Sequence, residues 1–174
     1  MARILVIGCP GAGKSTLARR IAECLALPLV HLDREFWLPG WAEPTREAWR
    51  TKVEELASRP AWVMDGDFPS TMEVRLRRAT HVIWLDFALW RCVGRVFRRI
   101  ARHYGRVRPD MAPGCPERID WPFLKYVWDY KRDCRPTVAA FAAGLRPDQT
   151  RIVLRSPAAV RRFEDGLPAT LELA

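Results

Sequence analysis

The chain has 174 residues, of which 49% are hydrophobic and 28% charged, a composition that suits one globular domain and excludes an intrinsically disordered protein. Its formal net charge of +9, carried mostly by arginine, allows either nucleic-acid binding or the handling of phosphate groups. No apolar run approaches the roughly 20 residues of a transmembrane helix, and no secretory signal pattern is present, so we expect a cytoplasmic protein.

The first half of the chain alternates between short apolar runs and helical spacing. A buried strand at residues 3–7 leads into a helix at 14–25, and a second strand is expected at 29–32. Residues 33–44 are rich in tryptophan, proline and glycine, which predicts a loop. Thr45 is then placed to cap the next helix.

The second half continues this alternation. Further apolar strands are expected at 61–64, 80–85 and 151–154. Further helices are expected at 89–103, 120–144 and 158–165. Residues 104–116 lack periodicity, and Pro136 is expected to break or kink its helix. Five strands separated by helices predict one α/β domain over 1–174, with a parallel sheet that binds ligands at the carboxyl ends of its strands.

The five cysteines are dispersed along the chain and form no Cys-x-x-Cys pair. This pattern argues against a disulfide framework and against a zinc site, and the three histidines are equally dispersed. We therefore expect reduced thiols that pack as small hydrophobic side chains.

Residues 8–15 read Gly-Cys-Pro-Gly-Ala-Gly-Lys-Ser and match the phosphate-loop pattern G-x-x-x-x-G-K-[ST] between a predicted strand and a predicted helix. In such a loop, backbone N–H groups surround phosphate oxygens, the lysine reaches the β- and γ-phosphates, and the serine hydroxyl ligates Mg²⁺. We therefore predict an ATP site made by Gly8, Pro10, Gly11, Ala12, Gly13, Lys14, Ser15 and Thr16.

A Mg²⁺ ion at such a site needs acidic support from the end of a neighbouring strand. Asp65 and Asp86 each follow a predicted strand. We favour Asp65, together with Ser15, as the metal site, because Gly66 gives a backbone turn that is open to a ligand. The alternative is that Asp65 is only a turn residue.

Asp33 follows the second predicted strand and therefore lies near the phosphate loop. Its carboxylate could accept a hydrogen bond from a substrate hydroxyl, or take the proton of that hydroxyl. Phe36, Trp37 and Trp41 follow in the same segment. These aromatic side chains either pin the segment to the domain or form a stacking wall for a planar or apolar acceptor.

Arginines stand at helical spacing on one face of the predicted helix 89–103. They are Arg91, Arg95, Arg98, Arg99 and Arg102. No acidic residue lies between positions 90 and 107, so these side chains repel one another unless an anion or an acidic element meets them. Arg106 and Arg108 follow in a segment that could close as a lid and stabilise charge during phosphoryl transfer. The alternatives are a solvated basic face, or salt bridges to the acidic residues of segment 117–133.

These motifs resemble the P-loop kinases related to adenylate and shikimate kinases, and in particular the group often labelled topology-modulation proteins or adenylate-kinase-like ATPases. Besides the phosphate loop, the matching stretches are 31–33 with 36–37 and 39–41, 62–66, 105–111 with 114–117, and 155–157. The resemblance implies a three-layer P-loop NTPase fold with sheet order 2-3-1-4-5. It also implies an acceptor-binding insertion at 33–60 and a lid at 104–118.

The resemblance also implies roles for individual arginines. Arg91 and Arg95 look like the adenylate-kinase pair that stacks on adenine and contacts phosphate. Arg106 and Arg108 look like lid arginines. The stretch Arg155-Ser156-Pro157 looks like the loop that borders the adenine base.

The chain departs from adenylate kinases after its third predicted strand. Adenylate kinases carry Gly-Phe-Pro-Arg there, and that arginine binds the acceptor phosphate. Residues 66–71 of this chain read Gly-Asp-Phe-Pro-Ser-Thr, with no arginine before Arg75 and an added negative charge at Asp67. The acceptor is therefore expected to be another nucleotide or a small hydroxylated metabolite.

Together, these features predict a kinase that moves the γ-phosphoryl group of Mg–ATP to such an acceptor. The predicted catalytic side chains are Lys14, Asp33, Arg95, Arg106 and Arg108. The alternative is a regulatory P-loop ATPase that binds nucleic acid, which the charge of +9 also permits. We favour the kinase, because the arginines concentrate in the predicted lid region and no nucleic-acid-binding module is recognisable.

Overall fold

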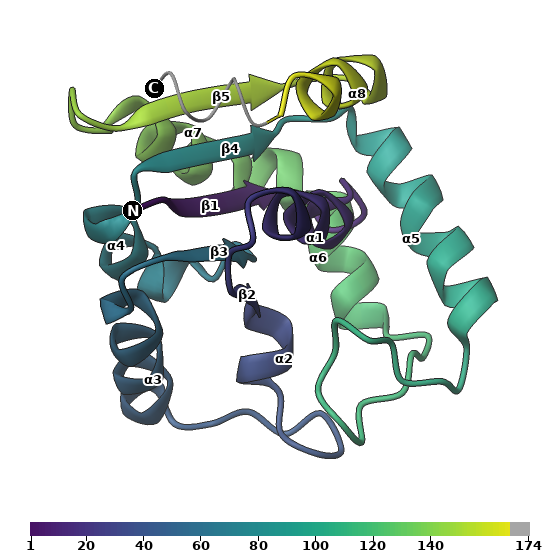
Figure 1. Ribbon diagram of the computed structural model, residues 1–174. Helices are drawn as coiled ribbons and strands as arrows, with labels where there is room; N and C mark the ends of the chain where they lie inside the picture. The colour runs from purple at the N-terminus through teal and green to yellow at the C-terminus, as the bar shows by residue number, and fades with distance from the viewer. Residues whose placement is uncertain (168–174) are drawn as a thin grey trace.

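Five parallel strands form the centre of this computed structural model, which describes residues 1–167 (Figure 1). They lie in the order β2-β3-β1-β4-β5, so the predicted α/β fold and sheet order are confirmed. Their bounds are β1 Arg3–Gly8, β2 Leu29–His31, β3 Trp62–Asp65, β4 His81–Leu85 and β5 Thr150–Leu154. Because neighbouring strands are parallel throughout, their carboxyl ends meet at one edge of the sheet.

Helices cover both faces of the sheet. They are α1 Lys14–Cys24, α2 Leu32–Phe36, α3 Arg46–Ser58, α4 Pro69–Arg78, α5 Leu89–His103, α6 Trp121–Asp133, α7 Arg135–Ala143 and α8 Pro157–Asp165. Figure 1 shows α1 and α8 on one face and α6 and α7 on the other. This double cover explains why the central strands are continuous apolar runs with no polar alternation. Within residues 1–167, no helix is long and apolar enough to cross a membrane.

Two local signals in the sequence act as predicted. The Thr45 hydroxyl accepts a hydrogen bond from the Ala48 backbone N–H at 3.2 Å and so caps α3. The predicted helix 120–144 is broken next to Pro136, because α6 ends at Asp133 and α7 begins at Arg135.

Two helices were not predicted. α2 lies in the segment that we expected to be a loop; its five residues are anchored by the fully buried Leu32 and are too few to show a helical period. α4 has no counterpart among the predicted elements. Its buried face contains Thr71, Met72 and Arg75, so an arginine stands where an apolar residue would have indicated an amphipathic helix.

Arg75 holds the turn between β3 and α4 from inside the protein. Its side chain is 0% exposed, and its guanidinium group donates hydrogen bonds to the carbonyl oxygens of Gly66 (2.8 Å), Asp67 and Phe68 (2.9 Å). Burial lowers the pKa of Arg75 to about 10, an effect that the nearby Asp67 carboxylate opposes. Arg75 is therefore still charged at neutral pH and satisfies three carbonyl groups at once.

Asp67 links the same turn to the phosphate loop. Its carboxylate accepts a hydrogen bond from the Gly8 backbone N–H at 2.8 Å and another from the Tyr130 hydroxyl at 2.9 Å. The side chain is buried, so these two donors replace the water that a buried carboxyl group lacks. The turn, the phosphate loop and α6 are thus held together at the carboxyl edge of the sheet.

Replacing Arg75 with leucine should lower the free energy of unfolding by about 3 kcal/mol, because three buried carbonyl groups lose their donor. The matched control is Arg77→Leu on the same helix, where the arginine is exposed and pairs with Glu73. The control should change stability by about 0.5 kcal/mol or less. Urea unfolding followed by tryptophan fluorescence measures both values, and similar losses in the two variants would contradict the role given to Arg75.

Candidate functional site

The phosphate loop joins the end of β1 to the start of α1, as predicted. Gly11 has a φ of +83°, and a Cβ atom there would lie 2.4 Å from the Cys92 carbonyl oxygen of α5, so only glycine fits. The Lys14 ammonium group donates a hydrogen bond to the Gly8 carbonyl oxygen at 2.5 Å. The loop ends at the first residue of α1. A phosphate group bound by the loop would therefore lie at the positive end of the α1 dipole, which stabilises it.

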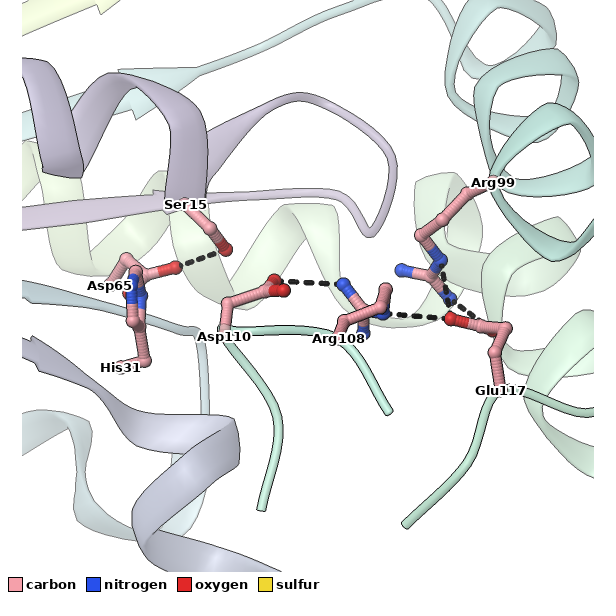
Figure 2. A network of polar contacts seen from close by, with 7 residues as sticks. All are labelled: Ser15, His31, Asp65, Arg99, Arg108, Asp110 and Glu117. Atoms are coloured by element: carbon pink, nitrogen blue, oxygen red, sulfur yellow. Dashed lines mark hydrogen bonds and ion pairs between the residues drawn. The ribbon is translucent and has the colours of Figure 1, made fainter. Parts of the chain in front are cut away.

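Asp65 and Ser15 form the polar pair that was predicted from the sequence. Asp65 ends β3 and is 4% exposed, and it accepts a hydrogen bond from the Ser15 hydroxyl at 2.6 Å. Its other oxygen lies 2.5 Å from Nδ1 of His31, at the end of β2 (Figure 2). His31 was not predicted as a site residue. What places it in the site is the register of β2 and β3, which pairs His31 with Asp65.

The donor set of this pair fits Mg²⁺. A hydroxyl and a carboxylate are hard oxygen ligands, and Mg²⁺ in phosphate-binding sites takes one or two protein oxygens together with phosphate and water. The His31 ring orients the Asp65 carboxylate from the side that faces away from Ser15. Over residues 1–167, no group of three or more His, Cys, Asp or Glu side chains is arranged to hold a metal ion.

Asp86, the competing metal candidate, is engaged elsewhere. Its two oxygens each lie 2.8 Å from the Arg135 guanidinium group of α7, and Arg155 approaches within 3.8 Å. Such a bidentate ion pair occupies the carboxylate. The geometry therefore favours Asp65 over Asp86 as the acidic residue beside Ser15.

Asp33 lies on α2, with its carboxylate among the charges of the site. It is half-buried and, within the described chain, makes no side-chain hydrogen bond or ion pair. Burial raises the pKa of Asp33; the positive charges of Lys14 and Arg108 oppose this shift, and the carboxylates of Asp65 and Asp110 add to it. An available carboxylate with a raised pKa, close to the phosphate-loop lysine, is suited to accept a proton.

A chain of ion pairs runs from the segment 104–118 to α5, as Figure 2 shows. Arg108 contacts Asp110 at 2.7 Å and Glu117 at 2.8 Å. Glu117 is 5% exposed and also contacts Arg99 of α5 at 3.2 Å. For Arg99, the alternative of a salt bridge to the segment beginning at residue 117 is therefore the correct one.

Asp110 places a second carboxylate close to Ser15. Burial by itself would raise the pKa of Asp110, but Arg108, a backbone N–H group, His31 and a hydrogen bond to Ser15 outweigh it and lower that pKa. The carboxylate is therefore ionised. Sequence reasoning missed Asp110, and the only signal was its position two residues after Arg108.

The other predicted arginines have separate environments. Arg95 donates a hydrogen bond to the Ala12 carbonyl oxygen at 3.0 Å and so lies against the phosphate loop. Arg91 stacks on the exposed Trp90 ring at 4.7 Å. Arg155 is 74% exposed next to Pro157, the first residue of α8.

Three further arginines are exposed and, among the described residues, make no side-chain hydrogen bond or ion pair. They are Arg98, Arg102 and Arg106. For Arg98 and Arg102, this agrees with the alternative of a solvated basic face. The predicted lid arginine Arg106 is thus not brought together with the Lys14, Asp33 and Asp65 side chains.

The aromatic side chains of segment 36–41 pin that segment in place. Trp37 and Trp41 pack with one another and against a small buried cluster in the segment 104–118. The Trp41 indole N–H donates to the Pro116 carbonyl oxygen at 3.2 Å. Phe36 packs on both Trp37 and Trp49 of α3, so these contacts agree with the pinning role.

Comparisons with known proteins extend the description of the fold. No protein-family model matches the sequence, and no curated protein matches it. Solved structures do: shikimate kinase from Acinetobacter baumannii in complex with shikimate has a TM-score of 0.63 at 18% identity, over 100% of this chain and 97% of that one. Shikimate kinase from Bacteroides thetaiotaomicron has a TM-score of 0.60 at 18% identity, over 98% of each chain. These likenesses show that the chain shares the fold of the two shikimate kinases. The finer resemblance to the topology-modulation group stays a prediction.

Replacing Asp65 with asparagine should weaken nucleotide binding in the presence of Mg²⁺ roughly 10- to 100-fold, because the metal loses its acidic support. Binding of the nucleotide without Mg²⁺ should change little. Asp86→Asn removes a carboxylate at the same edge of the sheet and should leave the Mg²⁺ dependence intact. Titration calorimetry with and without Mg²⁺ tests this, and an equal response of the two variants would contradict the assignment.

Proposed function

We propose that this protein is an ATP-dependent phosphotransferase, which moves the γ-phosphoryl group of Mg–ATP to a hydroxyl group of a small acceptor. One observation carries the proposal: a phosphate loop, an oxygen pair suited to Mg²⁺ and an available carboxylate converge at one edge of the sheet. The fold shared with the two shikimate kinases supports it. In open α/β sheets this edge is where ligands bind.

Nucleotide binding in this proposal uses the phosphate loop and its neighbours. Backbone N–H groups at the end of the phosphate loop that joins α1 surround the phosphates, and Lys14 turns from the Gly8 carbonyl oxygen to the β- and γ-phosphates. Ser15 and Asp65 hold Mg²⁺, which supplies positive charge to the phosphate oxygens. Arg91 and the loop Arg155-Ser156-Pro157 border the adenine base.

The transfer step uses the acceptor hydroxyl as the nucleophile. Its oxygen forms a bond to the γ-phosphorus while the bond from that phosphorus to the ADP oxygen breaks, and its proton passes to the Asp33 carboxylate. Arg95 lies at the phosphate loop and is placed to stabilise the charge on the transferring group. The lid arginines Arg106 and Arg108 would contribute only after the lid moves, because Arg106 is exposed and Arg108 is paired with Asp110 and Glu117. Segment 33–60 would contribute the acceptor site, and segment 104–118 would exclude water.

The direct test is ADP release with Mg–ATP, screened against nucleosides, nucleoside monophosphates and small hydroxylated compounds, with a water-only control. A compound that raises turnover well above the control, and itself gains phosphate, establishes the kinase. Slow turnover that is indifferent to every compound favours the regulatory ATPase instead. In that case, an affinity for duplex DNA that falls steeply with salt would support the nucleic-acid role.

Lys14→Ala should reduce phosphoryl transfer at least about 100-fold, because the transferring phosphoryl group loses its principal cation. The fold should persist, since the lysine is only partly buried and bonds within its own loop. Lys125→Ala is the matched control, a 75% exposed lysine paired with Asp129 of α6. Assays of turnover and circular dichroism of both variants check this, and undiminished transfer by Lys14→Ala would overturn the proposal.

Asp33→Asn should lower kcat roughly 100- to 10 000-fold, because amides do not take the acceptor proton. In the wild-type enzyme, activity should fall as pH drops through the raised pKa of Asp33, since the protonated carboxyl group is no longer a base. The residual activity of the variant should lack this acidic limb. A pH profile of kcat/KM tests both points, with Asp148→Asn as the exposed control that retains the limb.

Asp33→Asn should also raise the melting temperature of the protein without substrates. The pKa of Asp33 is higher in the folded state than in the unfolded state, so the folded state binds the proton more tightly. At neutral pH the ionised carboxylate therefore opposes folding, and this cost diminishes as pH falls towards the raised pKa. A neutral asparagine removes it, so thermal unfolding at pH 7 should show a gain that vanishes in acid.

A further inference from the structure

Arg75, the arginine nearest to the turn after β3, is not available to bind a charged acceptor. Arg75 is 0% exposed, and its donors are directed at the carbonyl oxygens of Gly66, Asp67 and Phe68. The additional acid of this turn, Asp67, is also turned inward, to the Gly8 N–H and the Tyr130 hydroxyl. Neither charge of the turn therefore reaches the space in front of the phosphate loop.

Two of the arginines that border the site are already neutralised by carboxylates. A third, Arg95, donates to the Ala12 carbonyl oxygen of the phosphate loop and is assigned to the transferring phosphoryl group. Arg108 lies between Asp110 at 2.7 Å and Glu117 at 2.8 Å, and its side chain is 10% exposed. Arg99 shares the same Glu117 at 3.2 Å. Glu117 is itself fixed, because its backbone N–H donates to the Arg106 carbonyl oxygen at 2.9 Å. A single buried carboxylate thus holds both guanidinium groups.

When the groups assigned to Mg–ATP are set aside, which are Lys14, Arg95 and Asp65, carboxylates outnumber cations among the remaining charges of the site. These cations are Arg99 and Arg108. The carboxylates are those of Asp33, Asp110 and Glu117. The nucleotide phosphates themselves bring further negative charge. A second anion would therefore meet net repulsion in a partly desolvated space.

We propose that the phosphoryl acceptor carries hydroxyl groups but no carboxylate or phosphate group, and that Glu117 determines this specificity by neutralising Arg99 and Arg108. The chemical class is an uncharged polyol or sugar, or an amino sugar, whose hydroxyl or ammonium donors match the oxygens of Asp33 and Asp110. This proposal rests on the proposed function. The transfer itself is unchanged: the acceptor oxygen bonds to the γ-phosphorus, ADP leaves, and Asp33 takes the proton.

The first test asks whether the site rejects an anion, and it needs no turnover. Inorganic phosphate is titrated calorimetrically into the protein saturated with Mg²⁺ and a non-hydrolysable ATP analogue. Glu117→Gln should bind phosphate at least tenfold more tightly than the wild type, because both arginines lose their shared carboxylate. Asp110→Asn, which removes one of the two carboxylates paired with Arg108, should shift affinity in the same direction by a smaller factor. Equal affinities in all three proteins, or tightest binding by the wild type, would overturn the proposal.

The second test compares matched acceptors that differ in one charged group. Suitable pairs are glucitol with gluconate, glucose with glucuronate, and adenosine with AMP, assayed by ADP release and by the mass of the product. The uncharged member should have a kcat/KM at least tenfold higher, and Glu117→Gln should reduce that ratio. A merely structural Glu117 would lower activity on both members equally, which counts against the proposal.

The two tests separate failure of the inference from failure of the proposed function. Efficient phosphorylation of the anionic members would overturn the inference while leaving the kinase intact. Turnover indifferent to every compound would overturn the kinase, and the phosphate titration would then still decide whether Glu117 keeps anions out of the site.

Discussion

The hydrogen bonds of the Asp67 carboxylate are the contacts on which the geometry of the site depends. They join Gly8 of the phosphate loop to Tyr130 of α6, while Arg75 fixes the backbone of the same turn. Burial, followed by the Asp67 charge, raises the pKa of the Tyr130 hydroxyl, so that hydroxyl stays protonated and keeps its role as a donor. Because the turn is held from the inside, Asp65 at the end of β3 is positioned against Ser15 without any contribution from solvent-exposed groups.

The parts of the molecule that the sequence predicted well are those with a local physical signature. Buried parallel strands are continuous apolar runs, and the phosphate loop has a glycine pattern with a steric cause, seen at Gly11 against the Cys92 carbonyl oxygen. Thr45 and Pro136 act on their own neighbours within a few residues. In each case the residues that determine the structure lie close together in the chain, so one sequence is sufficient to find them.

The parts that were missed depend on contacts between distant positions. The pairing of His31 with Asp65 was missed, and that of Arg99 with Glu117 was only one of the alternatives, because each joins segments whose proximity follows from the topology. The arginines of α5 looked alike in the sequence, yet Arg99 is paired while Arg98 is exposed to solvent. Helix α4 was missed for the same reason, because only the folded structure supplies the carbonyl groups that allow an arginine to occupy the core.

The net charge of the chain differs from the charge beside the proposed acceptor position, and this difference has a physical consequence. The charge of +9 includes exposed arginines in water, where salt screens their fields within about 10 Å. The charges around Lys14 act in a partly desolvated space, where each interaction is stronger. A basic exterior can therefore attract an anionic nucleotide from solution. In our proposal, the carboxylates inside determine which second substrate is accepted. Burying Arg108 and Arg99 with Glu117 carries a desolvation penalty that the ion pairs only partly offset, so their contribution is better understood as fixing the charge and geometry of the site than as stabilising the fold.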